Sequence, residues 1–283
     1  PADPTRAALS LETGSDVLPL GDGLISGGSM AGLMRFQNED LVDARNQLGQ
    51  MAMAFATKVN TQQAMGLDLG DPPGPGSALF EVTDPVALAN QNNARDGSGT
   101  FIASVSLSIS DATLLQASDY ELTNDAANPG QYLLTRLSDG LSRTISDGDT
   151  VDGFTVSVPA PGLQTGDRFL LQPVGHAASN MTRALDDPNG IAAAAPVTAT
   201  VGASNKGTAS IASLKVTSPA IDPSNSVSIT FSTDSGDYDY AITDAAGNLV
   251  QTGSGTWVPG QPIALNDAEI SLNGVPKAGD TLS

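Results

Sequence analysis

One stretch of 40 residues, from Gly27 to Gly66, constrains the fold more than any other part of the chain. It reads GGSMAGLMRFQNEDLVDARNQLGQMAMAFATKVNTQQAMG. No proline interrupts it, so every residue can donate the backbone hydrogen bond that a helix needs. Ser29 is a suitable N-cap residue, and Gly66 stands where a left-handed glycine would end a helix. The stretch predicts one long helix, and Asn38-Glu39-Asp40 is a candidate break that would leave residues 29–37 as a short helix of their own.

Apolar side chains recur along this helix at three- and four-residue spacing, so they share one face. This helix seam consists of Leu41, Ala44, Leu48, Met51, Phe55 and Val59. A helix from Asp40 to Met65 would be about 39 Å long, too long to pack fully against one small β domain. The seam is therefore expected to serve intrachain or subunit packing. An intrachain core is the simpler role for an apolar stripe, and subunit contacts would then use the more polar flanks.

The composition limits the partners of the chain. Its 283 residues suffice for two or three domains. The 31 acidic residues against 12 basic ones give a formal charge of −19, which repels the phosphates of nucleic acids and anionic lipids. No window approaches the ~18 consecutive apolar residues that suggest a membrane span. We therefore expect neither a nucleic acid nor a membrane as a partner.

Residue types that support catalysis or bind metals are scarce. His176 is the only histidine and cysteine is absent, which excludes a zinc site. A Ser-His-Asp site would have to use His176, and the sequence indicates no third residue that would orient this histidine. Two acidic clusters, Asp147 to Asp152 and Asp234 to Asp239, are interpreted as turn formers, and the first departs from the EF-hand pattern. Paired carboxylates of a glycosidase cannot be separated from chance pairs, although one tryptophan and 4% aromatic residues argue against that activity. We expect no enzyme, no metal and no cofactor.

The remaining residues alternate between turns and short strands. Apolar runs around a glycine-containing turn predict a hairpin before the helix. Leu67 to Gly76 contains three prolines and three glycines and marks a linker or a boundary. Six strand candidates with turn residues between them follow from Phe101 to Gln172, which predicts an antiparallel sandwich or small barrel. A short helix is expected near 177–185.

The last region repeats the β pattern. The segment SVSLSISDATLLQASDYEL corresponds to ASLKVTSPAIDPSNSVSITF. Three further correspondences keep the same order: Tyr132 with Tyr238 or Tyr240, Asp152–Val158 with Asn266–Leu272, and Gly166–Leu170 with Gly279–Ser283. The first copy continues to Gln172, whereas the second reaches Ser283 partway through the same strand. The second β domain is thus expected to be truncated at its last strand, in a fragment of a longer protein.

These observations predict an α+β multidomain fold. Residues 1–72 would form a partial helical rod domain, with the N-terminal hairpin and the long helix. Two mainly antiparallel β domains of sandwich or barrel type would follow, the first over residues 73–203 and the second over residues 204–283.

Several motifs occur in one order along the chain. They are Gly27-Gly28, Arg35-Phe36, Asn46-Gln47-Leu48-Gly49, Asn60-Thr61-Gln62 and Gly66-Leu67-Asp68-Leu69, then LSISDATLLQASDYEL, GDRFLLQPVGHAASNM and DPNGIAAAAP. Together they resemble the flagellar hook-associated protein 1 family (FlgK), strongly over residues 23–200 and more weakly over 205–283. The run Pro72-Pro73-Gly74-Pro75 departs from the shorter turn of that family, which affects only the geometry of the linker.

The resemblance implies a structural protein of the bacterial flagellum that forms the hook–filament junction. Such a protein would assemble into a ring through helical domains, expose its β domains outward, and reach the extracellular flagellum by type III export without a cleaved signal. Its partners would be other copies of itself, the hook protein, the second junction protein (hook-associated protein 3), and an export chaperone bound through termini absent from this chain. The alternative is a secreted multi-domain β adhesin without catalytic activity, against which the long helix argues.

Overall fold

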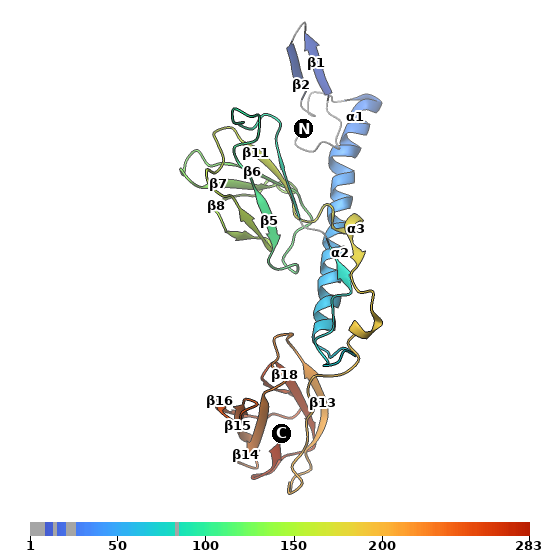
Figure 1. The fold of residues 1–283 in the computed structure, drawn as a ribbon, viewed down its shortest axis with the longest axis vertical. Coiled ribbons are helices and arrows are strands. Elements are labelled where there is room, and N and C mark those ends of the chain that lie inside the picture. The colour runs from blue at the N-terminus through green and yellow to red at the C-terminus, as the bar shows by residue number, and fades with distance from the viewer. Residues whose placement is uncertain (1–8, 14–15, 21–26, 83–84) are drawn as a thin grey trace. The chain divides into compact units, whose positions relative to one another are not determined.

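The computed structural model describes residues 9–13, 16–20, 27–82 and 85–283. The chain forms two compact units, one from residues up to Lys58 together with Phe80–Arg183, the other from Val59–Leu79 together with Ala184–Ser283. Long helical and antiparallel β elements are both present, which confirms the α+β class (Figure 1).

The predicted N-terminal hairpin is present. Strand β1 (Leu9–Thr13) pairs antiparallel with β2 (Asp16–Leu20), and Leu11 lies opposite Leu18. The residues of the turn itself lie outside the described part of the chain.

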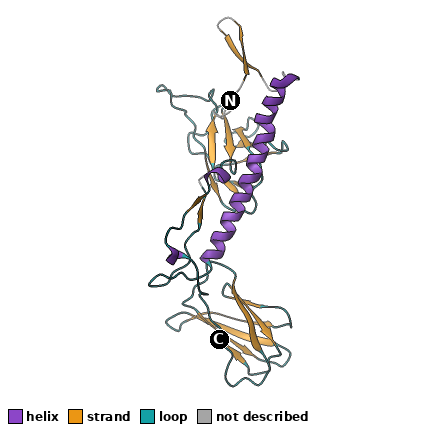
Figure 2. Ribbon diagram, turned by 90° about the vertical axis from the view of Figure 1, so that its right-hand side faces the viewer, coloured by secondary structure: helices purple, strands orange, loops and turns teal. Residues whose placement is uncertain are grey.

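The long helix consists of α1 (Gly28–Arg35), η2 (Phe36–Asp40) and α2 (Leu41–Ala64), shown in purple in Figure 2. The candidate break at Asn38-Glu39-Asp40 is one π-helical turn, which widens the helix without interrupting it. The expectation that Ser29 caps the helix was wrong. Gly27 holds the N-cap position with an extended backbone and no side-chain hydrogen bond, so Ser29 falls inside the first turn.

Gly66 does not end the helix in the left-handed conformation, contrary to the sequence-based expectation. A side chain at this position would bring its Cβ to 2.8 Å from the Cβ of Ala192 and 3.2 Å from the carbonyl oxygen of Ala194. Leu67, the next residue, donates its N–H to the Ala194 carbonyl at 2.8 Å. The glycine is therefore required by the close approach of two chain segments.

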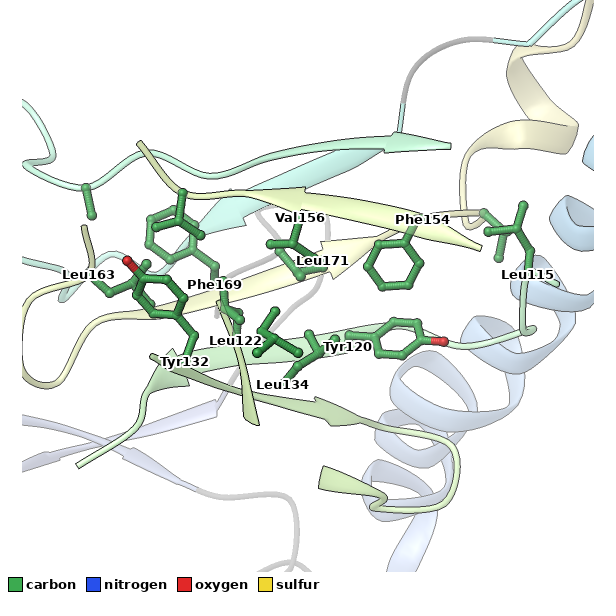
Figure 3. Packing of buried hydrophobic residues seen from close by; sticks show 14 of the residues in the cluster. Leu115, Tyr120, Leu122, Tyr132, Leu134, Phe154, Val156, Leu163, Phe169 and Leu171 are labelled. Atoms are coloured by element: carbon green, nitrogen blue, oxygen red, sulfur yellow. The ribbon is translucent and has the colours of Figure 1, made fainter. Parts of the chain in front are cut away.

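The first β unit contains two antiparallel sheets. One has the order β4 (Val86–Ala89), β11 (Arg168–Gln172), β6 (Tyr120–Asn124), β7 (Tyr132–Arg136) and β8 (Ser142–Ile145). The other has the order β5 (Ser106–Ile109), β10 (Phe154–Ser157) and β9 (Thr150–Val151). Their facing apolar side chains form one core, in which Tyr120 and Phe154 meet edge to face with ring centroids 4.9 Å apart (Figure 3).

The helix expected near 177–185 is shorter than predicted. Helix α3 covers only Ala177–Asn180, because Met181 takes an extended conformation and Thr182–Arg183 forms β12, which pairs with β3 (Phe80–Glu81). A 3-10 turn, η3 (Pro188–Gly190), follows and is capped by the Asp187 carboxylate, which accepts from the Asn189 N–H at 2.9 Å.

The second β unit repeats the topology of the first, as the sequence predicted. Its sheets have the orders β16 (Leu249–Thr256), β15 (Asp237–Thr243), β14 (Ser226–Phe231), β19 (Thr281–Leu282), and β13 (Ser210–Val216), β18 (Ala268–Asn273), β17 (Ile263–Leu265). These correspond strand for strand to β8, β7, β6, β11 and to β5, β10, β9. Val201 forms a bridge with Leu282 and so takes the place that β4 has beside β11.

The two copies share an asparagine contact that the sequence pattern does not predict. In the first copy, Asn93 accepts from the Arg168 N–H and donates to the Arg168 carbonyl, both at 2.9 Å. In the second, Asn205 makes the same two bonds with Thr281, also at 2.9 Å. Each asparagine thereby fixes a loop to the start of the strand β11 or β19.

A buried aspartate precedes each of these strand starts. Asp167 accepts from the N–H groups of Ala94 and Gln164, both at 2.8 Å. Asp280 receives three such bonds, of 2.6, 3.0 and 2.9 Å, from Lys206, Gly207 and Lys277. We call each asparagine with its aspartate a clasp. A buried carboxylate is stabilised only if such donors replace water, so the clasps are structural parts of both copies.

An open cavity of about 390 Å³ lies in the second β unit. Apolar side chains from both sheets line it, among them Leu214, Val227, Leu265, Ala268, Ile270 and Leu282.

Candidate functional site on the long helix

Helix α2 has a buried face made of small and polar residues. Asn46, Gly49, Ala56 and Gln63 are buried, and Met53 and Asn60 complete the face at three- and four-residue steps. We call this the small-residue face. It is set off from the apolar seam around the helix, so the two faces can serve different contacts.

The small-residue face packs against the first β unit. A Cβ at Gly49 would overlap the carbonyl oxygen of Val174, so only glycine allows the helix backbone to come this close. One residue further, Gln50 donates from Nε2 to the Leu115 carbonyl at 2.6 Å. Met53 packs against the core of the same unit. The first β unit is thereby seated on the helix by contacts that leave the apolar seam out.

Polar side chains extend this contact. The Oδ1 of Asn46 is buried and has no hydrogen-bond partner among the described residues, and it lies 3.1 Å from the position of a Cβ on Gly175. Nearby, Gln172 donates from Nε2 to the Asp119 carboxylate at 3.3 Å, and His176 Nε2 lies 3.2 Å from the Gln172 Oε1. The only histidine of the chain is therefore part of a packing contact.

The C-terminal end of α2 uses the same face for contacts inside the compact unit formed by Val59–Leu79 and Ala184–Ser283. The Asn60 Oδ1 accepts from the Leu79 N–H at 2.9 Å, and Gln63 donates from Nε2 to the Gly190 carbonyl at 3.0 Å. A Cβ on Gly76 would lie 2.5 Å from the Gln63 carbonyl oxygen, so a glycine is again required by close approach. The proline-rich segment is in this way fixed to the end of the helix.

The apolar seam predicted from the sequence lies away from these contacts. Leu48, Met51 and Phe55 are 58%, 68% and 54% exposed, and Leu41 and Ala44 are exposed as well. Val59 is half-buried. Among the described residues, the small-residue face makes the contacts with the first β unit, because Gly49 lets the helix approach Val174 at backbone distance. Whether the seam packs on other helices stays a prediction.

The exposed apolar surface continues into the first helical segments. Met30, Leu33 and Phe36 are each more than half exposed. Part of the Phe55 ring contacts the ring of Phe80, with the two ring centroids 5.4 Å apart. An exposed row of large apolar side chains of this length on one helix is typical of a surface that another helix covers.

The acidic clusters of the sequence hold turns. Asp147 accepts from the Val158 N–H at 2.7 Å, and Asp149 accepts from the Ser146 N–H at 2.8 Å. Hydrogen bonds from Thr256 and then Thr233 lower the pKa of Asp237. Within the described residues, no three His, Cys, Asp or Glu side chains are grouped so that they could hold a metal ion.

Asp152 has the most interactions of these carboxylates. It sits in the left-handed region at φ 48° and accepts from the Tyr120 hydroxyl at 2.8 Å and from Arg136 at 3.0 Å. Burial, and then the hydrogen bond to Asp152, raise the pKa of Tyr120 well above its ordinary value. This network ties the turn before β10 to the sheet.

None of the helices in the part of the chain that the structure describes is both long and apolar enough to cross a bilayer. One face of α2 packs on β structure and another is exposed.

The molecule is thus an α+β protein that has a long helix with an exposed apolar seam and, along the chain, two antiparallel β units. Sequence models of known families identify its relatives. Residues 1–80 match the helical domain of flagellar hook-associated protein FlgK, and residues 89–173 match the D2-like domain of flagellar hook-associated protein 1. The two matches together cover more than half of the chain.

Individual proteins agree with these matches. Flagellar hook-associated protein 1 of Salmonella typhimurium is 34% identical over 185 residues, which are 64% of this chain and 32% of that protein. The Escherichia coli K12 protein of the same name is 31% identical over 199 residues, 68% of this chain and 34% of its own. The flagellar hook junction protein FlgK from Burkholderia pseudomallei has a TM-score of 0.71 at 28% identity, over 95% of this chain and 52% of that chain.

The chain belongs to the flagellar hook-associated protein 1 (FlgK) family. It spans about a third of the length of the curated relatives it matches. Membership in this family overturns the alternative interpretation as a secreted β adhesin.

Proposed function

We propose that this chain is part of a structural protein of the hook–filament junction in the bacterial flagellum. The family membership supports the location, and the exposed seam of Leu48, Met51 and Phe55 on a helix whose other face is already packed supports the mode of assembly. Burying apolar surface contributes about 25 cal/mol per Å², so such a seam gains most from a neighbouring helix.

The proposed arrangement assigns a role to each part of the chain. Residues 1–72 belong to a helical rod domain that packs on other helices through the seam. Residues 73–203 and 204–283 form two β domains that face outward. The topological repeat supports the separation of the two β domains, because each copy has its own sheets, core and clasp.

The proposed partners are other copies of the protein in a ring, the hook protein and the second junction protein, hook-associated protein 3. An export chaperone would bind segments outside this chain, and the assembled protein would be extracellular. The role is structural and not enzymatic. Support comes from the names of the relatives and from the engagement of the clustered acids in turns.

The test places Leu48→Glu and Met51→Glu together in the complete protein, in a bacterium that lacks its own copy. We expect hooks without attached filaments and a loss of swimming, seen by electron microscopy and in soft agar. Val258→Glu is the matched control, since Val258 is 52% exposed but lies in the second β unit. The 283-residue chain with the double substitution should keep its circular dichroism spectrum. Normal swimming of a folded double variant would refute the proposed assembly through the seam.

A further inference from the structure

The two copies of the β unit end in very different edge strands. Strand β8 closes the larger sheet of the first copy, and β16 holds the same place in the second. β8 has four residues and includes Arg143, whose guanidinium lies 4.0 Å from the Asp152 carboxylate. β16 has eight residues, LVQTGSGT, with neither a charge nor a proline. Short length and charge are the usual protection of an edge strand, and β16 has neither.

The backbone of β16 faces outward at alternate residues. Trp257 donates its N–H to the Gly236 carbonyl of the preceding turn, at 2.8 Å. Because the direction of backbone groups alternates along a strand, Gly255 and Gly253 also face β15, and the residues between them face away. Thr252, Ser254 and Thr256 therefore direct their N–H and C=O groups to the open side of the sheet, and the described residues supply no partner for these groups.

We propose that β16 is a pairing edge for β16 of a second copy of this chain, in antiparallel orientation about a two-fold axis at Ser254. In this register Ser254 pairs with its own counterpart, and Thr252 pairs with Thr256 of the second copy. Each outward residue then exchanges both of its backbone hydrogen bonds. Such a contact is isologous, because the same surface serves on both copies.

Charge favours this strand as the place where two copies meet. The chain carries a formal charge of −19, so most of its surface repels another copy. β16 is an uncharged stretch within it. Two carboxylates of β15 lie beside it: that of Asp237, which accepts from the Thr256 hydroxyl at 2.7 Å, and that of the exposed Asp239, which lies opposite Ser254. Across the proposed axis two Asp239 residues would be three strand spacings apart, about 14 Å, which exceeds the screening length of about 8 Å at physiological salt.

The side chains of β16 leave the edge accessible. Toward the core, Gly253 and Gly255 lie under the rings of Tyr240 and Tyr238, and a Cβ at either glycine would come within 2.7 Å of a ring atom. Leu249 and Val250 at the start of the strand are 63% and 57% exposed. Subunits of one ring all point the same way along its axis, so a two-fold contact would join free copies or copies in different assemblies.

The absence of cysteine permits a direct test by disulfide formation. Paired residues that exchange both backbone bonds have Cα atoms about 5.5 Å apart, within the roughly 4.4–6.8 Å that a disulfide spans. The 283-residue chain with Ser254→Cys should form covalent dimers at least about tenfold faster under mild oxidation than the chain with Thr144→Cys, because pairing raises the effective concentration of the thiols. Thr144 is the matched control, since it is exposed and holds the equivalent outward position on β8.

A second variant separates backbone pairing from mere exposure. Thr252→Pro removes one outward N–H donor, and edge strands accept proline. Added to Ser254→Cys, it should reduce the rate of dimer formation to that of Thr144→Cys, while the fluorescence of the buried Trp257 shows that the unit stays folded. Equal rates for Ser254→Cys and Thr144→Cys would overturn the proposal. So would a fast rate that persists in the folded proline variant.

Discussion

The first copy of the β unit fills its core with two aromatic rings where the second copy has small side chains and a cavity. The strand ladders place Leu122 opposite Phe169 and Ile229 opposite Leu282. Counted back by two residues along β6 and β14, Tyr120 therefore corresponds to Val227. In the same way, the pairing of Val151 with Phe154 and of Leu265 with Ala268 matches Phe154 to Ala268.

Val227 and Ala268, the smaller residues at these two positions, both line the open cavity of about 390 Å³. The strand order, the left-handed turn residues before β10 and β18, and the clasps are nevertheless alike in the two copies. The turns and the buried polar contacts therefore stabilise this topology in both copies, although the volume of the core differs between them. Four experiments test that conclusion.

The largest effect is expected from emptying the first core. Phe154 is fully buried, so Phe154→Ala should lower the free energy of unfolding of the first unit by about 3–5 kcal/mol. Hydrogen exchange of peptides from β6 to β11 in increasing urea measures this unit. Fluorescence of Trp257, the only tryptophan and a buried residue of the second core, should show an unchanged transition. A loss below about 1 kcal/mol would mean that the first core is as tolerant as the second.

The clasps should matter equally in both copies. Asp167→Ala and Asp280→Ala each leave part-buried backbone N–H groups without their carboxylate acceptor, at a cost of about 1–3 kcal/mol. The same two measurements, exchange for the first unit and Trp257 fluorescence for the second, give the two values. If one substitution costs several times more than the other, the clasp is not the shared support of the two copies.

Filling the second cavity should give a smaller change of opposite sign. Ala268→Leu adds apolar volume where the first copy has an aromatic ring, and we expect a gain of about 0.5–2 kcal/mol in the free energy of unfolding. Urea unfolding followed by Trp257 fluorescence measures it. Ala241→Leu serves as a control on β15, in the other sheet of the second β unit, at a position that does not line the cavity. A loss of stability with Ala268→Leu would show that the space is already used by its neighbours.

The smallest effect concerns pH. Burial acts to raise the pKa of Asp280, but hydrogen bonds from Lys277, Lys206 and Gly207 outweigh it and lower the pKa below its ordinary value. The stabilisation from the ionised group is therefore present above about pH 4 and is lost as the pH falls through the lowered pKa. Asp280→Asn should make the unfolding free energy of the second unit less steep between about pH 4 and 2, as followed by Trp257 fluorescence. An unchanged slope would contradict this.

Much of the fold could be predicted because local signals and tertiary structure agree. Period-two apolar residues between turn residues indicated β6, β7, β8, β10 and β11, and the duplicated order indicated the second unit. The clasps could not be predicted, because they join residues more than 70 positions apart, such as Asn93 and Arg168. The only signal was the recurrence of an asparagine ahead of corresponding strands, Asn93 before β5 and Asn205 before β13.

The contact face of the long helix was harder to predict than its existence. An apolar stripe usually marks the side that faces a core, so the pattern predicts contacts through Leu48 and Met51. The intrachain contact is instead decided by Gly49, whose lack of a side chain admits the Val174 carbonyl. The spacing from Asn46 through Gly49 to Met53 and Ala56 carries that signal, but it competes with a more hydrophobic pattern on the same helix. The partner of the seam is not evident from hydrophobicity at all.

The π-turn η2 affects the spacing of the exposed apolar residues along the helix. Before α2 the exposed apolar positions include Leu33 in α1 and Phe36, the first residue of η2, and in α2 they begin at Leu41. The step from Phe36 to Leu41 is five residues, one too many for a single stripe on a regular α-helix. In η2 the Leu41 N–H donates to the Phe36 carbonyl five residues back, so the turn takes up one extra residue.

With that residue absorbed, the seam from Leu33 to Phe55 alternates strictly between steps of three and four, which is the heptad phase of a coiled coil. The π-turn thus keeps the exposed apolar residues before and after it on the same side of the helix. A single apolar stripe therefore runs across both helical segments, as the proposed packing on a neighbouring helix requires.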